Sequence, residues 1–429
     1  MDVMLKSLKS LFMNSRNAER DSYTWNMVQS MLFAVQSAIL LMVINRTNSL
    51  DDAGVFSIAY AVASLIYYLG EFGVRKYQIT DVNEKASFCD YHTHRVTTCL
   101  IAMLASFVYA GALLGTGQYT TYKFLIVIIV CAMKVLESYC DVFFSRFQQK
   151  GRLDVAAKAS TYRIVLPMAA CMASLIITHD LFVSMMIWLA VTVLAILTSF
   201  ILLAPEFGKI EFHINREKFL LITRECLPLF AGNFLLLYVG NAPKYAIDAC
   251  LDDKAQACFN FIFMPVFVIG LLANFIFNPI LVKLARAWND GDRKTFNRIV
   301  GRQIGVIAAI TLLAVAVALT IGCPVLGILF HADLADSRWS LTVLMIGGGM
   351  LALANFLIVV VTVVRKQKYL LPGYIAAAVA AKLLSEYFVT SYGVPGASAL
   401  YVCLMTLASL FFAVVLLISI RKTDQPEKA

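Results

Sequence analysis

The fold is decided by residues 121–145, which read TYKFLIVIIVCAMKVLESYCDVFFS. This stretch is long and apolar enough to cross a bilayer as a helix, which needs about 20 residues. It nevertheless carries Lys134, Glu137 and Asp141 at spacings of three and four, so all three lie on one face of the helix. Lys134 lies about 18 Å from Tyr122 along the helix, near the bilayer midplane. Because an ionised group there costs at least roughly 3 kcal/mol unless it meets a partner or water, the other helices are expected to build a polar interior.

The composition of the whole chain supports a membrane protein. The 429 residues are 60% hydrophobic and only 15% charged, with a mean hydropathy of +0.77. Soluble domains are usually about a quarter charged. The net charge of +9 follows the expected membrane topology, so no nucleic-acid partner is predicted.

The apolar segments predict an all-α, polytopic membrane protein with twelve transmembrane helices in two six-helix bundles around a central cavity. The predicted spans are 23–45, 53–70, 94–115, 121–144, 160–178, 181–204, 226–247, 255–280, 302–322, 339–364, 372–391 and 396–420.

The distribution of lysine and arginine tests this count. With twelve spans, 29 of the 36 basic residues fall on one side, five fall on the other, and Lys134 and Lys382 lie inside spans. Arg75, Arg95 and Arg163 are counted here with the connections of the basic side. Since basic residues favour the cytoplasmic side, both termini are predicted to be cytoplasmic.

The predicted organisation has five parts. The parts are an amphipathic, membrane-surface segment (1–22), a six-helix bundle (23–204), a linker (205–225), a second bundle (226–420) and a tail (421–429). The acidic pairs Asp51-Asp52 and Asp252-Asp253 precede the second helix of each bundle, which favours a repeat of six helices.

A second intramembrane charge pair occurs in the eleventh predicted helix, where Lys382 and Glu386 are one turn apart. One interpretation is that Lys134 and Lys382 meet an anionic group in the cavity, while the nearby acids bind a coupling proton or Na⁺. The alternative is that each lysine only neutralises the acid on its own helix.

Enzymatic motifs are missing from the sequence. It contains no Walker A, HExxH or GxSxG pattern, and its scattered cysteines are interpreted as small apolar side chains. His92 and His94 are interpreted as a solvated loop pair, so neither a metal site nor a cofactor is predicted. The chain is therefore expected not to be an enzyme.

Three local motifs resemble the polysaccharide transporter, or O-antigen flippase-like, branch of the multidrug/oligosaccharidyl-lipid/polysaccharide (MOP) exporter superfamily. Gly70–Arg75 (GEFGVR) follows the second helix, Asn241–Asp248 (NAPKYAID) precedes the second acidic pair, and Pro324–Phe330 (PVLGILF) follows the ninth helix. Together with the twelve-helix plan, the resemblance covers nearly the whole chain.

This resemblance implies a bacterial inner-membrane flippase for an undecaprenyl-diphosphate-linked oligosaccharide, used to make O-antigen lipopolysaccharide or other surface polysaccharide. It also implies membrane lipids and polysaccharide polymerases as partners, and an ion gradient as the energy source. The implied diphosphate contacts are Lys134, Lys382, Arg46 and Lys244, and the implied ion-coupling groups are Glu137, Asp141 and Glu386.

Three alternatives stay open. The buried charges, two lysines against three acids, nearly balance, so a neutral repeat unit also fits. A multidrug exporter of the same superfamily would have a cavity rich in acids and aromatics. A membrane-embedded polysaccharide polymerase or ligase would need a large external loop, and the predicted outer loops are short.

Overall fold

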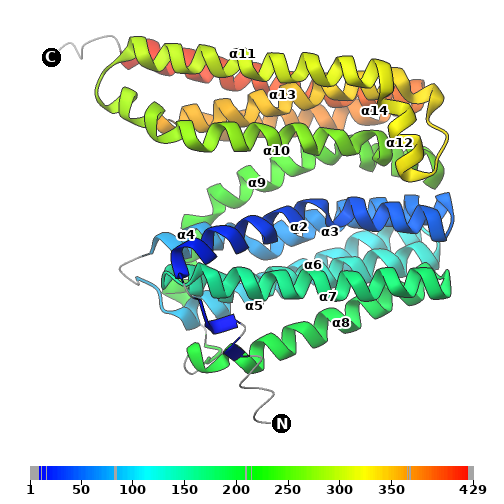
Figure 1. Ribbon diagram of the computed structural model, residues 1–429, viewed down its shortest axis with the longest axis horizontal. Helices are drawn as coiled ribbons and strands as arrows, with labels where there is room; N and C mark the ends of the chain where they lie inside the picture. The colour runs from blue at the N-terminus through cyan, green and yellow to red at the C-terminus, as the bar shows by residue number, and fades with distance from the viewer. Residues whose placement is uncertain are drawn as a thin grey trace. The chain divides into compact units, whose positions relative to one another are not determined.

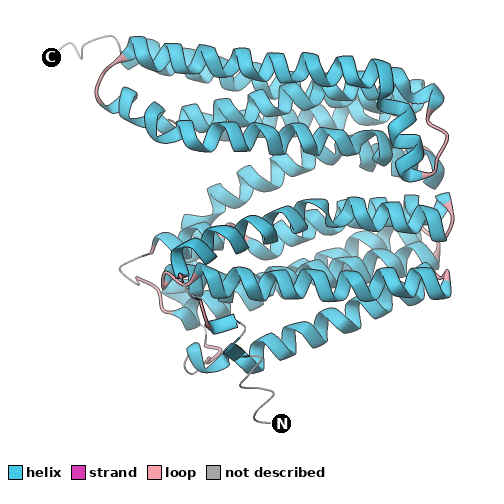
Figure 2. Cartoon of the chain, viewed as in Figure 1, coloured by secondary structure: helices cyan, strands magenta, loops and turns pink. Residues whose placement is uncertain are grey.

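The computed structural model describes residues 9–10, 12–15, 17–81, 85–207, 210–213, 215–364, 366 and 369–423. All regular secondary structure in these ranges is helical (Figure 2). The chain divides into two compact units, Met1–Phe234 and Leu235–Ala429, which we call unit 1 and unit 2. The predicted fold class, an all-α protein of two six-helix bundles, is confirmed.

Unit 1 contains six long helices and one short helix within the described residues (Figure 1). They are α2 (Ala18–Thr47), α3 (Leu50–Glu71), the short α4 (Val74–Thr80), α5 (Phe88–Gly115), α6 (Thr121–Gln149), α7 (Leu153–Thr178) and α8 (Leu181–Leu203). A 3₁₀ turn, η1 (Ala204–Glu206), follows α8. Helix α6 packs against α3, α5 and α8, which places its charged face inside the unit.

Unit 2 is built around α13, which packs against α10, α11 and α14. Its helices are α9 (Arg216–Cys250, which begins in unit 1), α10 (Asp253–Asn289), α11 (Arg293–Val317), the π turn η2 (Ala318–Gly322), α12 (Cys323–Phe330), the 3₁₀ turn η3 (Ala335–Ser337), α13 (Arg338–Val363) and α14 (Leu370–Thr423). Gly347 lets α13 approach α14 closely, because a Cβ atom there would lie 2.5 Å from Tyr401 Cδ1.

The membrane-spanning helices follow from length and hydropathy. Nine helical segments among the described residues are long and apolar enough to span a membrane by these criteria. Two more helices are long enough to span a membrane. Helix α6 has 29 residues but carries more charged residues than these criteria allow, and α10 has 37 residues. Helix α14 contains two spans, because the non-helical backbone of Gly393 (φ 60°, ψ −138°) separates them. The chain is therefore a multi-pass membrane protein, and its described residues supply twelve candidate spans when α6, α10 and the second half of α14 are added to the nine.

Several helices extend beyond the apolar windows that predicted them. Helix α5 begins at Phe88, six residues before the predicted start, because Ser87 and Asp90 form a reciprocal capping box. His92 and His94 are consequently buried on α5, so their interpretation as a solvated loop pair is wrong. His92 contacts Tyr139 Oη at 3.1 Å and His94 contacts Thr223 Oγ1 at 3.1 Å.

The connection between α4 and α5 is organised by Asp81, which lies outside the spans. Its carboxylate accepts hydrogen bonds from the Lys85 amide (3.0 Å), the Ala86 amide (3.2 Å) and the Tyr91 hydroxyl (2.8 Å). Burial by itself would raise the pKa of Asp81, but these hydrogen bonds to the ionised form lower that pKa overall. The Asp81 carbonyl accepts a further bond from Gln149 Nε2 at 2.8 Å, which ties the connection to the end of α6.

The N-terminal segment is bound to unit 1 where the structure describes it. Phe12 is 7% exposed and packs against the end of α6 and the start of α7. Lys158 Nζ donates to the Asn14 carbonyl (3.0 Å) and to Ser15 Oγ (2.9 Å). Most of the amphipathic pattern predicted for this segment, including residues 1–8, lies outside the described residues.

Candidate functional site

The central feature of unit 1 is a buried lysine on α6, whose ammonium is surrounded by an acid and two aromatic rings. Lys134 Nζ lies 2.7 Å from Glu137 Oε2, and the lysine side chain is only 5% exposed. The ammonium also lies 4.6 Å from the ring centroid of Phe33 on α2 and 4.8 Å from that of Tyr60 on α3. Aromatic faces attract cations, so the lysine is held by an acid and two rings from different helices.

Asp141, one turn beyond Glu137, pairs with two arginines. Its carboxylate lies 3.0 Å from Arg75 Nη1 and 3.6 Å from Arg95 Nη2. Arg95 is fully buried, and its Nη1 also donates to the Gly70 carbonyl and to Ser138 Oγ, both at 3.2 Å. The sequence pattern predicts that both arginines lie in a connection between helices. In the structure Arg75 lies on α4 and Arg95 lies on α5. Each of these helices therefore places an arginine beside the charged face of α6.

The motif Gly70–Arg75 forms the turn between α3 and α4, and this turn orients Arg75 toward Asp141. Gly73 has a φ of +71°, in the left-handed region that favours glycine, and a Cβ atom there would lie 2.9 Å from Leu229 Cβ. Glu71 is buried, and its carboxylate accepts a hydrogen bond from the Gly73 amide at 3.2 Å. Phe72 stacks on Phe230 with ring centroids 4.5 Å apart.

A polar cavity of about 220 Å³ opens beside these charges. It has room for several water molecules or one small polar group. Its charged lining residues are Arg75, Glu137, Asp141 and Arg163, and its other lining residues are Gln29, Ser30, Phe33, Tyr67, Phe144 and Ser160. A smaller cavity of about 50 Å³ adjoins it and is lined by Lys134, Glu137 and Arg163 among others. We call the two together the unit 1 cavity.

Arg163 is a residue of this site that the sequence did not predict. It lies ten residues into α7, about 15 Å from the start of that helix, and lines both parts of the unit 1 cavity. The sequence contained enough information to identify Arg163, because residue 163 falls inside the predicted span 160–178. Arg163 was overlooked because it was counted with the basic residues of the connection before that span.

The charges around the unit 1 cavity are still nearly balanced, as the sequence indicated, but the excess of one charge is positive instead of negative. Four cations (Lys134, Arg75, Arg95 and Arg163) lie with three acids (Glu71, Glu137 and Asp141). The surplus is positive because arginines from α4, α5 and α7 join the charges of α6. The arrangement can hold an anionic oxygen, and its carboxylates can hold a proton or a small cation.

The other predicted site residues lie elsewhere. Arg46 is exposed in the last turn of α2, thirteen residues beyond Phe33 and thus roughly 20 Å further along that helix. Lys244 is buried on α9 in unit 2, with Nζ 4.7 Å from the Phe263 ring centroid. Lys382 and Glu386 are both exposed on α14, and within the described residues they form no ion pair with each other.

Lys134 therefore pairs with Glu137 on its own helix while both also line the unit 1 cavity, whereas Lys382 and Glu386 do not pair with each other. Among the residues that the structure describes, no group of three or more His, Cys, Asp or Glu side chains could hold a metal ion.

The fold matches solved transporters over almost its full length. An inward-facing multidrug resistance MATE family transporter of the MOP superfamily is 14% identical with a TM-score of 0.68, covering 95% of this chain and 98% of that chain. A mutant of the Vibrio cholerae MATE transporter VcmN is 12% identical with a TM-score of 0.61, covering 98% of both chains. The chain shares the fold of these solved transporters.

A third solved structure and one curated relative add to the comparison. A MOP superfamily transporter from Pyrococcus furiosus, whose binding pocket of reverse polarity suggests a different function, is 13% identical with a TM-score of 0.55, covering 96% of this chain and 97% of that one. The capsular polysaccharide biosynthesis protein CapF of Staphylococcus aureus is 21% identical over 356 residues, covering 81% of this chain and 86% of that protein. No protein family model matches the chain. The resemblance to polysaccharide transporters of the MOP type, predicted from the sequence, is confirmed.

Proposed function

We propose that this protein is a flippase that moves a lipid-diphosphate-linked oligosaccharide across the bacterial inner membrane for surface polysaccharide synthesis. The observation that carries the proposal is the positive surplus of the unit 1 cavity, where Arg75 and Arg163 face open space within a membrane-spanning bundle. A guanidinium group binds phosphate oxygens in a bidentate manner, so such a cavity suits an anionic diphosphate. The similarity to CapF supports polysaccharide synthesis as the setting.

The transport cycle is proposed to run by alternating access, with no chemical step on the substrate. Lys134, Arg46, Lys244 and Lys382 are candidate diphosphate contacts, and Arg75 and Arg163 join them. Glu137, Asp141 and Glu386 are candidate groups for a coupling proton or Na⁺. The basic residues concentrated on one side favour a cytoplasmic location for both termini.

A multidrug exporter is the second candidate, because the solved MATE transporters share this fold. Organic cations would need a cavity with unpaired carboxylates. In unit 1, Glu137 is paired with Lys134, and Asp141 is paired with Arg75 and Arg95. Because the same pairs also occupy Lys134 and Arg75, the preference for an anionic ligand rests on Arg163, which lines the cavity and has no carboxylate within ion-pair distance among the described residues.

The test is complementation in a bacterium that lacks its own O-antigen or capsule flippase and carries the matching glycan genes. The wild-type chain is expected to restore surface polysaccharide, and Lys134→Ala is expected to abolish the rescue. Lys123→Ala is a matched control on α6, since Lys123 is also buried and lies 5.0 Å from the Tyr119 ring centroid. No rescue together with increased resistance to cationic dyes would assign the chain to drug export instead.

A further inference from the structure

The two arginines beside Asp141 hold its carboxylate unequally. Asp141 Oδ1 lies at hydrogen-bond distance from Arg75 Nη1, 3.0 Å, whereas Asp141 Oδ2 lies 3.6 Å from Arg95 Nη2. Within the described part of the chain, Oδ2 and Nη2 are both buried and neither has a hydrogen-bond partner. Buried polar atoms are almost always hydrogen-bonded, so two such atoms of opposite charge beside each other indicate an arrangement that is completed in another state.

The missing bond between Asp141 and Arg95 requires only a small movement. A charge-assisted N–H···O bond is about 2.8 Å long, so a shift of about 0.8 Å would join Oδ2 to Nη2. Arg95 is held in place for this bond, because its Nη1 atom donates to the Gly70 carbonyl and to Ser138 Oγ. Arg95 is fully buried and is not among the described residues that line the larger part of the cavity. Its charge is therefore available to Asp141 and not to a ligand.

Arg75 is in the opposite situation. Its side chain is 31% exposed and lines the larger part of the unit 1 cavity. Its guanidinium lies 4.3 Å from the ring centroid of Phe144, which lines the same space, so the group can turn toward the cavity while the ring still supports it. A buried carboxylate that loses its cation is strongly destabilised. Arg75 can therefore leave Asp141 for a ligand only if another cation takes its place.

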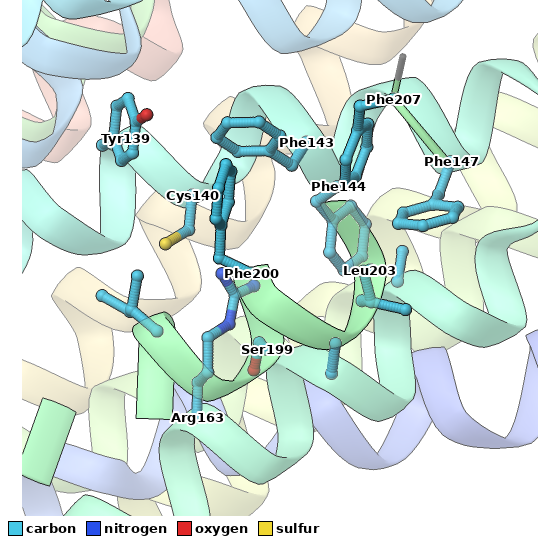
Figure 3. Close-up of a pocket in the computed structure, with 13 residues that line it drawn as sticks. Tyr139, Cys140, Phe143, Phe144, Phe147, Arg163, Ser199, Phe200, Leu203 and Phe207 are labelled. Carbon is cyan, nitrogen blue, oxygen red and sulfur yellow. The ribbon is translucent and has the colours of Figure 1, made fainter. Parts of the chain in front are cut away.

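Arg163 requires no such exchange, because no carboxylate among the described residues lies within ion-pair distance of it. It lines the same cavity as Arg75. In Figure 3 its side chain extends from α7 between Ser199 and Cys140 and ends beside the Phe200 ring. An anion that enters the cavity therefore meets one available arginine, Arg163, and one arginine that Asp141 still holds.

We propose that Asp141 exchanges Arg75 for Arg95 when an anionic group enters the unit 1 cavity, so that Arg75 and Arg163 both contact the anion. Arg95 is then a positioning residue, since it acts by keeping Asp141 neutralised and does not touch the ligand. The inference rests on the flippase function proposed above and takes the diphosphate of the carrier lipid as the anion.

The exchange keeps every charge in the cluster compensated. Before binding, Asp141 is paired with Arg75, and after binding it is paired with Arg95 while the ligand supplies the anion for Arg75. The carboxylate and the ligand thus compete for Arg75, and Arg95 weakens the hold of the carboxylate. Removal of the carboxylate should therefore strengthen binding, and removal of Arg95 should weaken it.

The experiment measures binding of undecaprenyl diphosphate to the full-length protein in phosphatidylcholine nanodiscs. Asp141→Asn removes the competing carboxylate, so we expect about fivefold tighter binding. Arg75→Gln removes a ligand contact and Arg95→Gln leaves Arg75 held by Asp141, so each should bind about tenfold more weakly. Arg95 keeps a neighbouring anion in Asp141→Asn, because the buried Glu71 also interacts with it electrostatically.

Two double variants with the same net charge separate the roles of the arginines. In Arg75→Gln/Asp141→Asn the ligand contact is missing, so binding should remain about tenfold weaker than in the wild type. In Arg95→Gln/Asp141→Asn nothing holds Arg75, so binding should return at least to the wild-type value. Asp52→Asn is the matched control, because Asp52 lies at the other end of α3 and accepts a hydrogen bond from the Tyr122 hydroxyl at 2.8 Å. It should bind like the wild type.

Equal affinities of the two double variants would overturn the proposal. So would an equal gain from Asp141→Asn in the wild type and in Arg75→Gln, because simple charge removal adds the same gain in both backgrounds. This second comparison decides the question if the Arg95→Gln variants fail to fold. A wild-type protein that binds no undecaprenyl diphosphate would also overturn the exchange.

The complementation assay separates this inference from the proposed function. Restored surface glycan by the wild-type chain, with no coupling between Arg75 and Asp141 in the binding cycle, would keep the flippase and reject the exchange. The expected binding pattern without glycan rescue would keep the exchange as a property of a diphosphate site and reject the proposed transport function.

Discussion

The ion pair between Lys134 and Glu137 is buried unequally, and this predicts an asymmetric response to mutation. The lysine side chain is 5% exposed and the glutamate side chain 29% exposed. Glu137→Gln leaves a buried ammonium without its anion, a loss of about 3–5 kcal/mol for a fully buried pair. The Phe33 and Tyr60 rings offset roughly 1–2 kcal/mol of this. We therefore expect Glu137→Gln to lower the free energy of unfolding by about 1–4 kcal/mol.

Lys134→Met is expected to cost less, because the remaining carboxylate borders the cavity and lies near Arg163. A partly hydrated carboxylate with a nearby cation loses about 1 kcal/mol. The double variant has no unpaired charge, and methionine fills the space beneath the rings, so it should be more stable than Glu137→Gln alone. Transport should be lost in every variant without Lys134, whatever its stability.

The measurement is a double-mutant cycle on purified protein, with unfolding followed by SDS titration and transport by surface glycan. Lys123→Met, at the other end of α6, is the matched control and should leave transport unchanged. Equal destabilisation by Lys134→Met and Glu137→Gln, or a double variant no more stable than Glu137→Gln, would contradict this prediction.

Three further predictions concern packing, pH and unit 2. Gly347→Ala pushes a methyl group against the Tyr401 ring and should cost about 1–3 kcal/mol of unfolding free energy, measured by thermal unfolding. Gly305→Ala is the control: the added methyl group meets open space, so the free energy of unfolding should not fall. Asp81→Asn should destabilise the protein at pH 7 by about 1–3 kcal/mol. Because the folded-state pKa of Asp81 is lowered, this difference should begin to shrink as the pH falls below about 4 and should disappear only below that lowered pKa, and a difference that is the same at pH 3 and pH 7 would contradict it. Lys382→Ala, at an exposed position, should leave stability unchanged and reduce surface glycan, and wild-type export would remove Lys382 from the site.

The sequence by itself determined the spanning helices, and it predicts that their basic connections lie on the cytoplasmic side. Spanning segments are set by local apolar length, so residues 121–145 identified α6 without knowledge of its neighbours. The cost of an intramembrane charge is also local, and it correctly required partners for Lys134 and Asp141. The sequence missed the polar ends of helices such as α5, because a capped helix continues past the apolar window.

Only the tertiary structure decided which groups became those partners. Phe33 and Tyr60 come to Lys134 from α2 and α3, and Arg75 and Arg95 come to Asp141 from α4 and α5. Hydropathy averages over neighbours in sequence, so it treats an arginine near a helix end as a loop residue. Pairing depends instead on which helix faces pack together, and packing brings distant residues onto one surface. The positive surplus of the cavity is therefore a property of the assembled bundle.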